Sequence, residues 1–231
     1  MKPIDFLKGH NFKNEYRIGD AVLHRNDAEA VVICEPMQTL FFKDTILNKY
    51  LWECRKEGKN IDIDKLRRIA LELGEKKGWE KPRKNDCVVH LRIGDTKRIT
   101  SSEVTTIINR LKEIRPAGVT FVSFYHHPAR VSEEEKIRTL EENDQTIHQL
   151  EDACDELGIR VNWRSCLNPD EDFYYLINAD TLLCTNGGFS IVSALANPKF
   201  NSDNFVGSKS DKEVYDFYMK GRDELLCTIT A

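Results

Sequence analysis

One segment of the chain carries a histidine, an arginine and an aspartate along and just after a run of strand-forming residues, Val88-Val89-His90-Leu91-Arg92-Ile93-Gly94-Asp95. In open parallel α/β sheets, ligands bind beyond the carboxyl ends of the strands. A guanidinium fixed there can bind a phosphate through two parallel hydrogen bonds. We therefore predict that Arg92 binds a pyrophosphate and that Asp95 orients the Arg92 side chain. The alternative is a structural salt bridge between Arg92 and Asp95. Since side chains alternate, His90 shares the face of Arg92 and is either a ligand contact or a packed residue.

A second segment has the composition of a phosphate-binding turn and spans residues 185–190. It follows an apolar strand pattern and precedes an apolar helix pattern. Glycines let the backbone approach a ligand closely, and a helix N-terminus offers N–H groups to an anion. The alternative is an ordinary strand-to-helix turn. A diphosphate would lie between Arg92 and this turn, because both segments end strands at one sheet edge. The predicted contacts in the turn are Asn186, Gly187, Gly188, Phe189 and Ser190.

A third strand pattern ends in the pair His126-His127. One of the two, His126 or His127, is predicted to contact a ribose or to act as a base. No third ligand stands at metal spacing, so no zinc site is expected. The segments 62–64 and 170–172 match the DxD pattern of metal-bound nucleotide sugars. Each begins a predicted helix, where the helix dipole favours carboxylates. We therefore predict no metal ion and keep Asp172 as a hydrogen-bond acceptor for a base edge.

Hydrophobic periodicity from residue 87 onward alternates strands with helices. This alternation predicts an α/β fold with a mainly parallel, Rossmann-like sheet covered on both faces. The expected strands are 87–93, 119–125, 159–163 and 181–184. The expected helices are 102–115, 132–157, 171–179, 189–196 and 211–224.

Residues 1–85 are predicted to form a short N-terminal α/β lobe, separated from a C-terminal lobe of residues 86–231 by the polar, proline-containing segment 81–85. The expected elements are a strand at 30–34 and helices at 41–54 and 62–74. The last of these helices is expected to end at Gly74, since glycine commonly follows a helix C-terminus.

Composition excludes several classes of protein. The formal net charge of −4, without any block of basic residues, argues against nucleic-acid binding. No apolar run is long enough to span a membrane, and the N-terminus lacks the apolar core of a secretion signal. The seven cysteines form no CxxC pair and are expected to be reduced thiols of a cytoplasmic protein. The sequence does not specify the oligomeric state.

Two of these segments together resemble the signatures of the fucosyltransferase-like glycosyltransferases. The segment 88–95 is similar to their HxRxGD or HxRRxD motif, and residues 172–190 resemble their second signature. In that signature an acidic residue and a short helix precede an apolar strand, and a turn of small residues then carries Phe-Ser into a helix. Gly187 and Gly188 stand where many members have serines, which leaves backbone amides to contact the diphosphate. The resemblance covers residues 87–197.

The resemblance implies a GT-B-like fold, in which two Rossmann-like lobes face each other and the C-terminal lobe binds the nucleotide sugar. It implies an inverting, metal-independent transfer of fucose, another deoxy sugar or a pentose from a GDP- or UDP-sugar to a glycan acceptor. Arg92 would bind the diphosphate, Asp172 the nucleobase, and residues 186–190 the phosphates. The alternative is a non-catalytic nucleotide- or glycan-binding module. The candidates for the base that removes the acceptor proton are Asp20, His24, Glu35 and Asp95.

Overall fold

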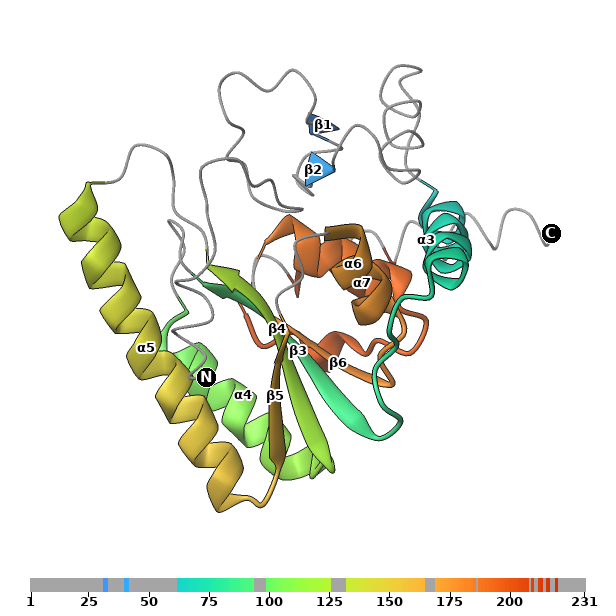
Figure 1. The fold of residues 1–231 in the computed structure, drawn as a ribbon. Coiled ribbons are helices and arrows are strands. Elements are labelled where there is room, and N and C mark those ends of the chain that lie inside the picture. The colour runs from blue at the N-terminus through green and yellow to red at the C-terminus, as the bar shows by residue number, and fades with distance from the viewer. Residues whose placement is uncertain are drawn as a thin grey trace.

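The computed structural model describes the chain in blocks that carry most of the predicted C-terminal lobe (Figure 1). These blocks are residues 31–32, 40–41, 62–93, 99–125, 132–164, 169–185 and 187–207, with further positions at 209, 212–213, 215–216 and 219.

The centre of the fold is a four-stranded sheet in the order β5-β4-β3-β6, in which every neighbouring pair is parallel. This confirms the α/β class and the parallel, Rossmann-like sheet predicted from the alternating pattern. The predicted strands agree with the observed ones to within one residue. The strands are β3 (Asp86–Ile93), β4 (Gly118–Tyr125), β5 (Arg160–Arg164) and β6 (Thr181–Cys184).

Helices cover both faces of this sheet (Figure 1). On one face lie α4 (Ser101–Ile114) and α5 (Glu133–Glu156), and on the other lie α3 (Ile63–Lys77), α6 (Pro169–Ile177) and α7 (Gly188–Ala196). Alternation along β3 divides its side chains between the two cores. Cys87, Val89 and Leu91 pack toward α4 and α5, whereas Val88 packs toward the other three helices. His90 and Arg92 share the parity of Val88, so they lie on the α6–α7 face.

Helix α3 continues past Gly74, the residue at which the sequence predicts its end. The helix is capped by Asp62, runs through Gly74 and ends at Gly78, whose φ of +66° is left-handed. Gly74 is buried within the helix and packs against the ring of Tyr174. A Cβ at this position would overlap that ring, so the packing requires glycine. The prediction was wrong at this point, since a glycine that permits close packing looks in sequence like a helix end.

Helix α3 also belongs to the same core as the sheet, although the sequence placed it in the N-terminal lobe. Leu66 and Ala70 are fully buried and pack in one cluster with residues of α6 and α7. Most of residues 1–61 lie outside the described part of the chain, so the boundary after residue 85 stays a prediction. Two short strands there, β1 (Val31–Val32) and β2 (Leu40–Phe41), pair antiparallel.

The chain beyond α7 returns to the sheet. The short 3₁₀ helix η2 (Ser202–Asn204) is followed by Phe205, which bridges to Cys184 at the end of β6. Tyr215 packs against Phe200 and Phe205. Within the predicted last helix, residues 212–213, 215–216 and 219 are helical. Among the helices of the described part, none has both the length and the apolarity to cross a bilayer.

Candidate functional site

The two predicted phosphate-binding segments lie side by side in space. The chain builds the sheet outward from β3 through β4 to β5 and then places β6 on the opposite side of β3. The carboxyl ends of β3 and β6 are therefore neighbours at the point where the strand order reverses. In open α/β sheets this switch point is where the ligand-binding crevice forms. Arg92 reaches it from β3, and the 185–190 turn reaches it from β6.

Thr185 joins the ends of these two strands. Its side chain is fully buried, donates a hydrogen bond of 2.9 Å to the backbone oxygen of His90 and accepts one of 3.2 Å from the backbone nitrogen of Arg92. The Thr185 backbone nitrogen also donates to the His90 oxygen, at 3.3 Å. These bonds extend the parallel pairing past the last residue of β6. They fix the position of Arg92, along the strand direction, relative to the turn that begins α7.

His90 packs against the first turn of α7. Its Nδ1 lies 2.6 Å from the hydroxyl oxygen of Ser190, and both residues are buried. The His90 ring also meets the ring of Phe189 edge to face, with centroids 5.1 Å apart. His90 and Ser190, both predicted site residues, therefore bond to each other. Together with Phe189 they fix the start of α7 against β3.

Arg92 lies directly against the backbone of Gly187. A Cβ added to Gly187 would overlap the Arg92 Nη1 atom and would lie 3.3 Å from Cδ and 3.4 Å from Cζ. The backbone of Gly187 has φ +97° and ψ 165°, a region that is essentially restricted to glycine. Both its conformation and its contact with the guanidinium therefore require glycine at this position.

The start of α7 has no side-chain cap. Gly187 is its N-cap residue and supplies no side-chain cap, and Gly188 begins the helix. The first N–H groups of a helix have no partner within it and carry a partial positive charge. Arg92 and these amides thus form a positively polarised surface at the switch point. Such a surface suits a phosphate or diphosphate.

Asp172 lies in a different set of contacts. It is in the first turn of α6, 7% exposed, and accepts a hydrogen bond of 3.0 Å from Nε of Arg164 at the end of β5. Arg164 also contacts Glu171 at 2.8 Å and Glu80 at 3.4 Å, and lies over the ring of Tyr175. Any contact of Asp172 with a nucleobase would have to share its carboxylate with Arg164.

Several predicted site residues lie outside the described part of the chain. They are Asp95, His126, His127, Asn186 and three candidate bases, Asp20, His24 and Glu35. The structure therefore brings together His90, Arg92, Gly187, Gly188, Phe189 and Ser190 and leaves the base unassigned. Within the described residues, no group of three histidine, cysteine or acidic side chains could hold a metal ion.

Two contributors were not singled out by sequence. Thr185 is included in the predicted turn but is given no role of its own, and no role is predicted for Arg164. The signal for Thr185 was available, since a hydroxyl residue directly after an apolar strand can bond to a neighbouring strand. Cys184 precedes it and is fully buried, which raises the pKa of its thiol well above the usual value.

The chain has no match among protein-family models, among curated proteins or among solved structures. Function is therefore inferred from the geometry of the switch point and from the motifs of the chain.

Proposed function

We propose that this chain is a glycosyltransferase that binds a nucleotide-diphosphate sugar at the β3–β6 switch point and transfers the sugar to a hydroxyl without a metal ion. The observation that carries the proposal is the packing of the Arg92 guanidinium on the Gly187 backbone, at the mouth of an uncapped helix. A diphosphate leaving group gains negative charge as the sugar departs. An arginine and a helix N-terminus are the groups that stabilise such charge.

The reaction would be a single displacement with inversion at the anomeric carbon. The acceptor hydroxyl attacks that carbon, the bond to the diphosphate breaks, and the leaving oxygens gain charge beside Arg92. One preorganised donor of this kind contributes about 3–4 kcal/mol to transition-state stabilisation. A base must also take the acceptor proton, and Asp20, His24, Glu35 and Asp95 remain its candidates. The resemblance adds a second lobe facing the sheet edge, in a GT-B arrangement, to hold a glycan acceptor.

A thermal-shift screen of GDP, UDP, dTDP and their sugars tests donor binding. At least one nucleotide should raise the melting temperature with a chelator present, because Arg92 and the α7 amides do the work of a metal. A strict requirement for Mg²⁺ or Mn²⁺ would contradict the proposal.

The Arg92→Ala variant tests the assignment of the guanidinium. It should abolish binding of that nucleotide and transfer of its sugar, while the melting temperature stays within a few degrees of the wild-type value. Arg68→Ala is the matched control, since Arg68 is an exposed arginine on α3, and it should change neither. Unfolding of Arg92→Ala alone would indicate a structural salt bridge. Nucleotide binding without transfer to any glycan acceptor would favour the non-catalytic binding module.

A further inference from the structure

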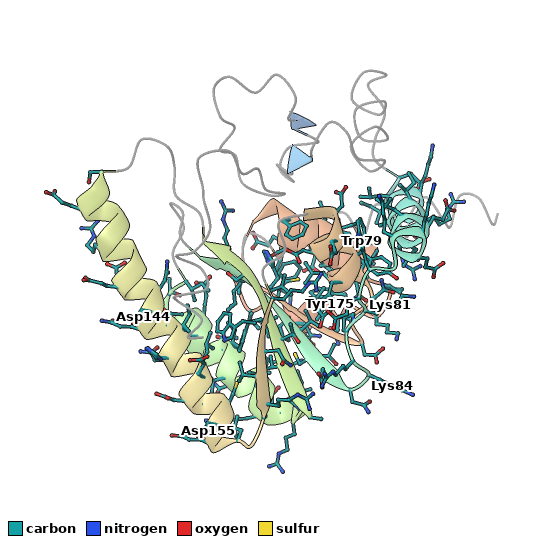
Figure 2. The ribbon with its side chains drawn as sticks, in the orientation of Figure 1. Trp79, Lys81, Lys84, Asp144, Asp155 and Tyr175 are labelled. Atoms are coloured by element: carbon teal, nitrogen blue, oxygen red, sulfur yellow. The ribbon has the colours of Figure 1, made fainter. Side chains whose placement is uncertain are left out.

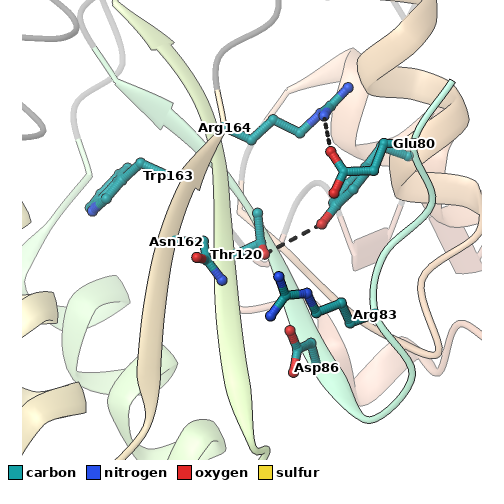
Figure 3. A pocket seen from close by; sticks show the side chains of 8 residues that line it. Glu80, Arg83, Asp86, Thr120, Asn162, Trp163 and Arg164 are labelled. Carbon is teal, nitrogen blue, oxygen red and sulfur yellow. Dashed lines mark hydrogen bonds and ion pairs between the residues drawn. The ribbon is translucent and has the colours of Figure 1, made fainter.

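A cavity lies on the α6 face of the sheet and shares no residue with the switch point. Its volume is about 360 Å³, within the range of about 300–1,000 Å³ typical of small-molecule sites. Figure 3 shows its side chains arriving from the strands and from the loop before β3. The lining residues are Glu80, Arg83, Asp86, Thr120, Asn162, Trp163, Arg164 and Tyr175.

This cavity reaches to the amino-terminal end of the sheet. Asp86 is the first residue of β3, and Thr120 and Asn162 are each the third residue of their strands. Arg92 comes six positions after Asp86, which corresponds to about 20 Å along an extended strand. A ligand bound near Asp86 would therefore be separate from a diphosphate at Arg92.

Both carboxylates that line the cavity already have guanidinium partners. Nη2 of Arg160 lies 3.1 and 3.0 Å from the two oxygens of Asp86, which is buried. Glu80 contacts Nη1 of Arg164 at 3.4 Å, and the same guanidinium bonds to two acidic residues of α6. Each of the two carboxylate charges is therefore paired with a guanidinium.

The donors in the cavity are not engaged in the same way. The Arg83 guanidinium points into the cavity (Figure 3), and among the described residues it has no hydrogen bond or ion pair. Thr120 accepts a hydrogen bond of 3.4 Å from the Tyr175 hydroxyl, which leaves its own proton to donate. The Asn162 side chain, on the exposed edge strand, adds an amide.

A fixed turn holds Arg83 in place. The Asp86 nitrogen donates to the Arg83 oxygen at 3.2 Å, and Asn85 has a φ of +67°, as the third residue of a type II turn requires. The chain before this turn is also held, because Trp79 packs edge to face on Tyr174 and Lys81 lies over the same ring. Trp79 and Lys81 are labelled in Figure 2. The turn thus holds the backbone of Arg83 in the position from which its guanidinium reaches the cavity.

We propose that this cavity binds a small oxyanion, the carboxylate or phosphate group of a small molecule, through Arg83, Asn162 and Thr120. An oxyanion supplies the acceptors that these donors lack, and its charge complements the one lining guanidinium that no described carboxylate neutralises. The volume suits a small metabolite. Carboxylate and phosphate share this chemistry, and the experiment distinguishes them.

Titration of the full chain with inorganic phosphate and, separately, with succinate tests the proposal at constant ionic strength. The readout is the side-chain amide resonance of Asn162, identified by its loss in Asn162→Asp. At least one probe should shift this resonance with a saturable curve. The probe that binds more tightly identifies the preferred class of oxyanion.

Three arginine variants locate the site. Arg83→Gln should weaken binding at least tenfold, whereas Arg68→Gln should leave it unchanged as a charge-matched surface control. Arg92→Gln should also leave the Asn162 shift unchanged, which separates this cavity from any phosphate bound at the switch point. Asn162→Asp, which places a carboxylate beside the anion, should weaken binding in calorimetry and serves if Arg83→Gln does not fold. A linear, non-saturable shift, equal affinity in Arg83→Gln, or a loss confined to Arg92→Gln would overturn the proposal.

Discussion

Replacing Gly187 with alanine separates the two demands that the switch point makes on this position. The first demand is conformational, because the φ of +97° and ψ of 165° at Gly187 are unfavourable for any residue with a Cβ. The second is spatial, because that Cβ would overlap the Arg92 guanidinium and displace it. Gly158 offers a matched control: its φ is +67°, and a Cβ there would meet nothing within 4 Å. Gly158→Ala therefore carries backbone strain without a displaced arginine.

The expected losses of stability follow from these geometries. A non-glycine residue in the backbone region of Gly187 costs about 1–3 kcal/mol, and one in the left-handed region of Gly158 costs about 1–2 kcal/mol. At about 2–4 °C per kcal/mol for a chain of this size, both variants should melt a few degrees below the wild type. Stability alone will thus not distinguish the two.

Nucleotide affinity distinguishes them. Hydrogen bonds to a charged group are worth about 1.5–3 kcal/mol, so displacing the guanidinium should raise the dissociation constant of the preferred nucleoside diphosphate by tenfold or more. Isothermal titration calorimetry should find that loss in Gly187→Ala, and wild-type affinity in Gly158→Ala. Wild-type affinity in a folded Gly187→Ala chain would refute the idea that Arg92 acts together with this backbone.

Three further outcomes are expected. Thr185→Val should lower the free energy of unfolding by about 1–3 kcal/mol in urea denaturation, since it removes the two buried hydrogen bonds that the Thr185 hydroxyl makes to the Arg92 amide and the His90 carbonyl. A change below about 0.5 kcal/mol would contradict the strand-joining role. Arg164→Met should lower the free energy of unfolding by about 1.5–3 kcal/mol, because it removes the guanidinium that pairs with the buried carboxylate of Asp172. Arg138→Met, which breaks an exposed ion pair on α5, should lower it by less than about 0.5 kcal/mol. Similar losses in the two variants would refute the distinction between the buried and the exposed pair. Burial raises the pKa of the Cys87 thiol to about 12 and that of the Cys154 thiol to about 11, and it raises the pKa of the Cys184 thiol well above the usual value. Peptide mapping at pH 8 should therefore find these three thiols unmodified by a thiol reagent until the chain unfolds. The free energy of unfolding should also fall as the pH rises above about 9, because only the thiols of the unfolded chain ionise there.

The parts of the fold that sequence predicts are those encoded locally. The strands from residue 86 onward each carry a short apolar run, and the alternation of strand and helix dictates a parallel sheet with one shared carboxyl edge. For that reason Arg92 and Gly187, 95 residues apart in the chain, could be placed near each other before any coordinates.

What sequence missed depends on residues distant in the chain. Gly74 read as a helix end because the Tyr174 ring that requires it lies 100 residues later. Thr185 acts on a strand 93 residues before it, and Arg164 gathers carboxylates from a loop and a helix that periodicity does not associate. Such contacts are set by tertiary packing, which no local pattern contains.

A crystal structure of the chain with its preferred nucleoside diphosphate tests the central claim most directly. We predict that the phosphate oxygens accept hydrogen bonds from the Arg92 guanidinium at about 2.7–2.9 Å and from the first amides of α7. A diphosphate bound elsewhere, with Arg92 still packed on Gly187 and touching no phosphate, would contradict the account.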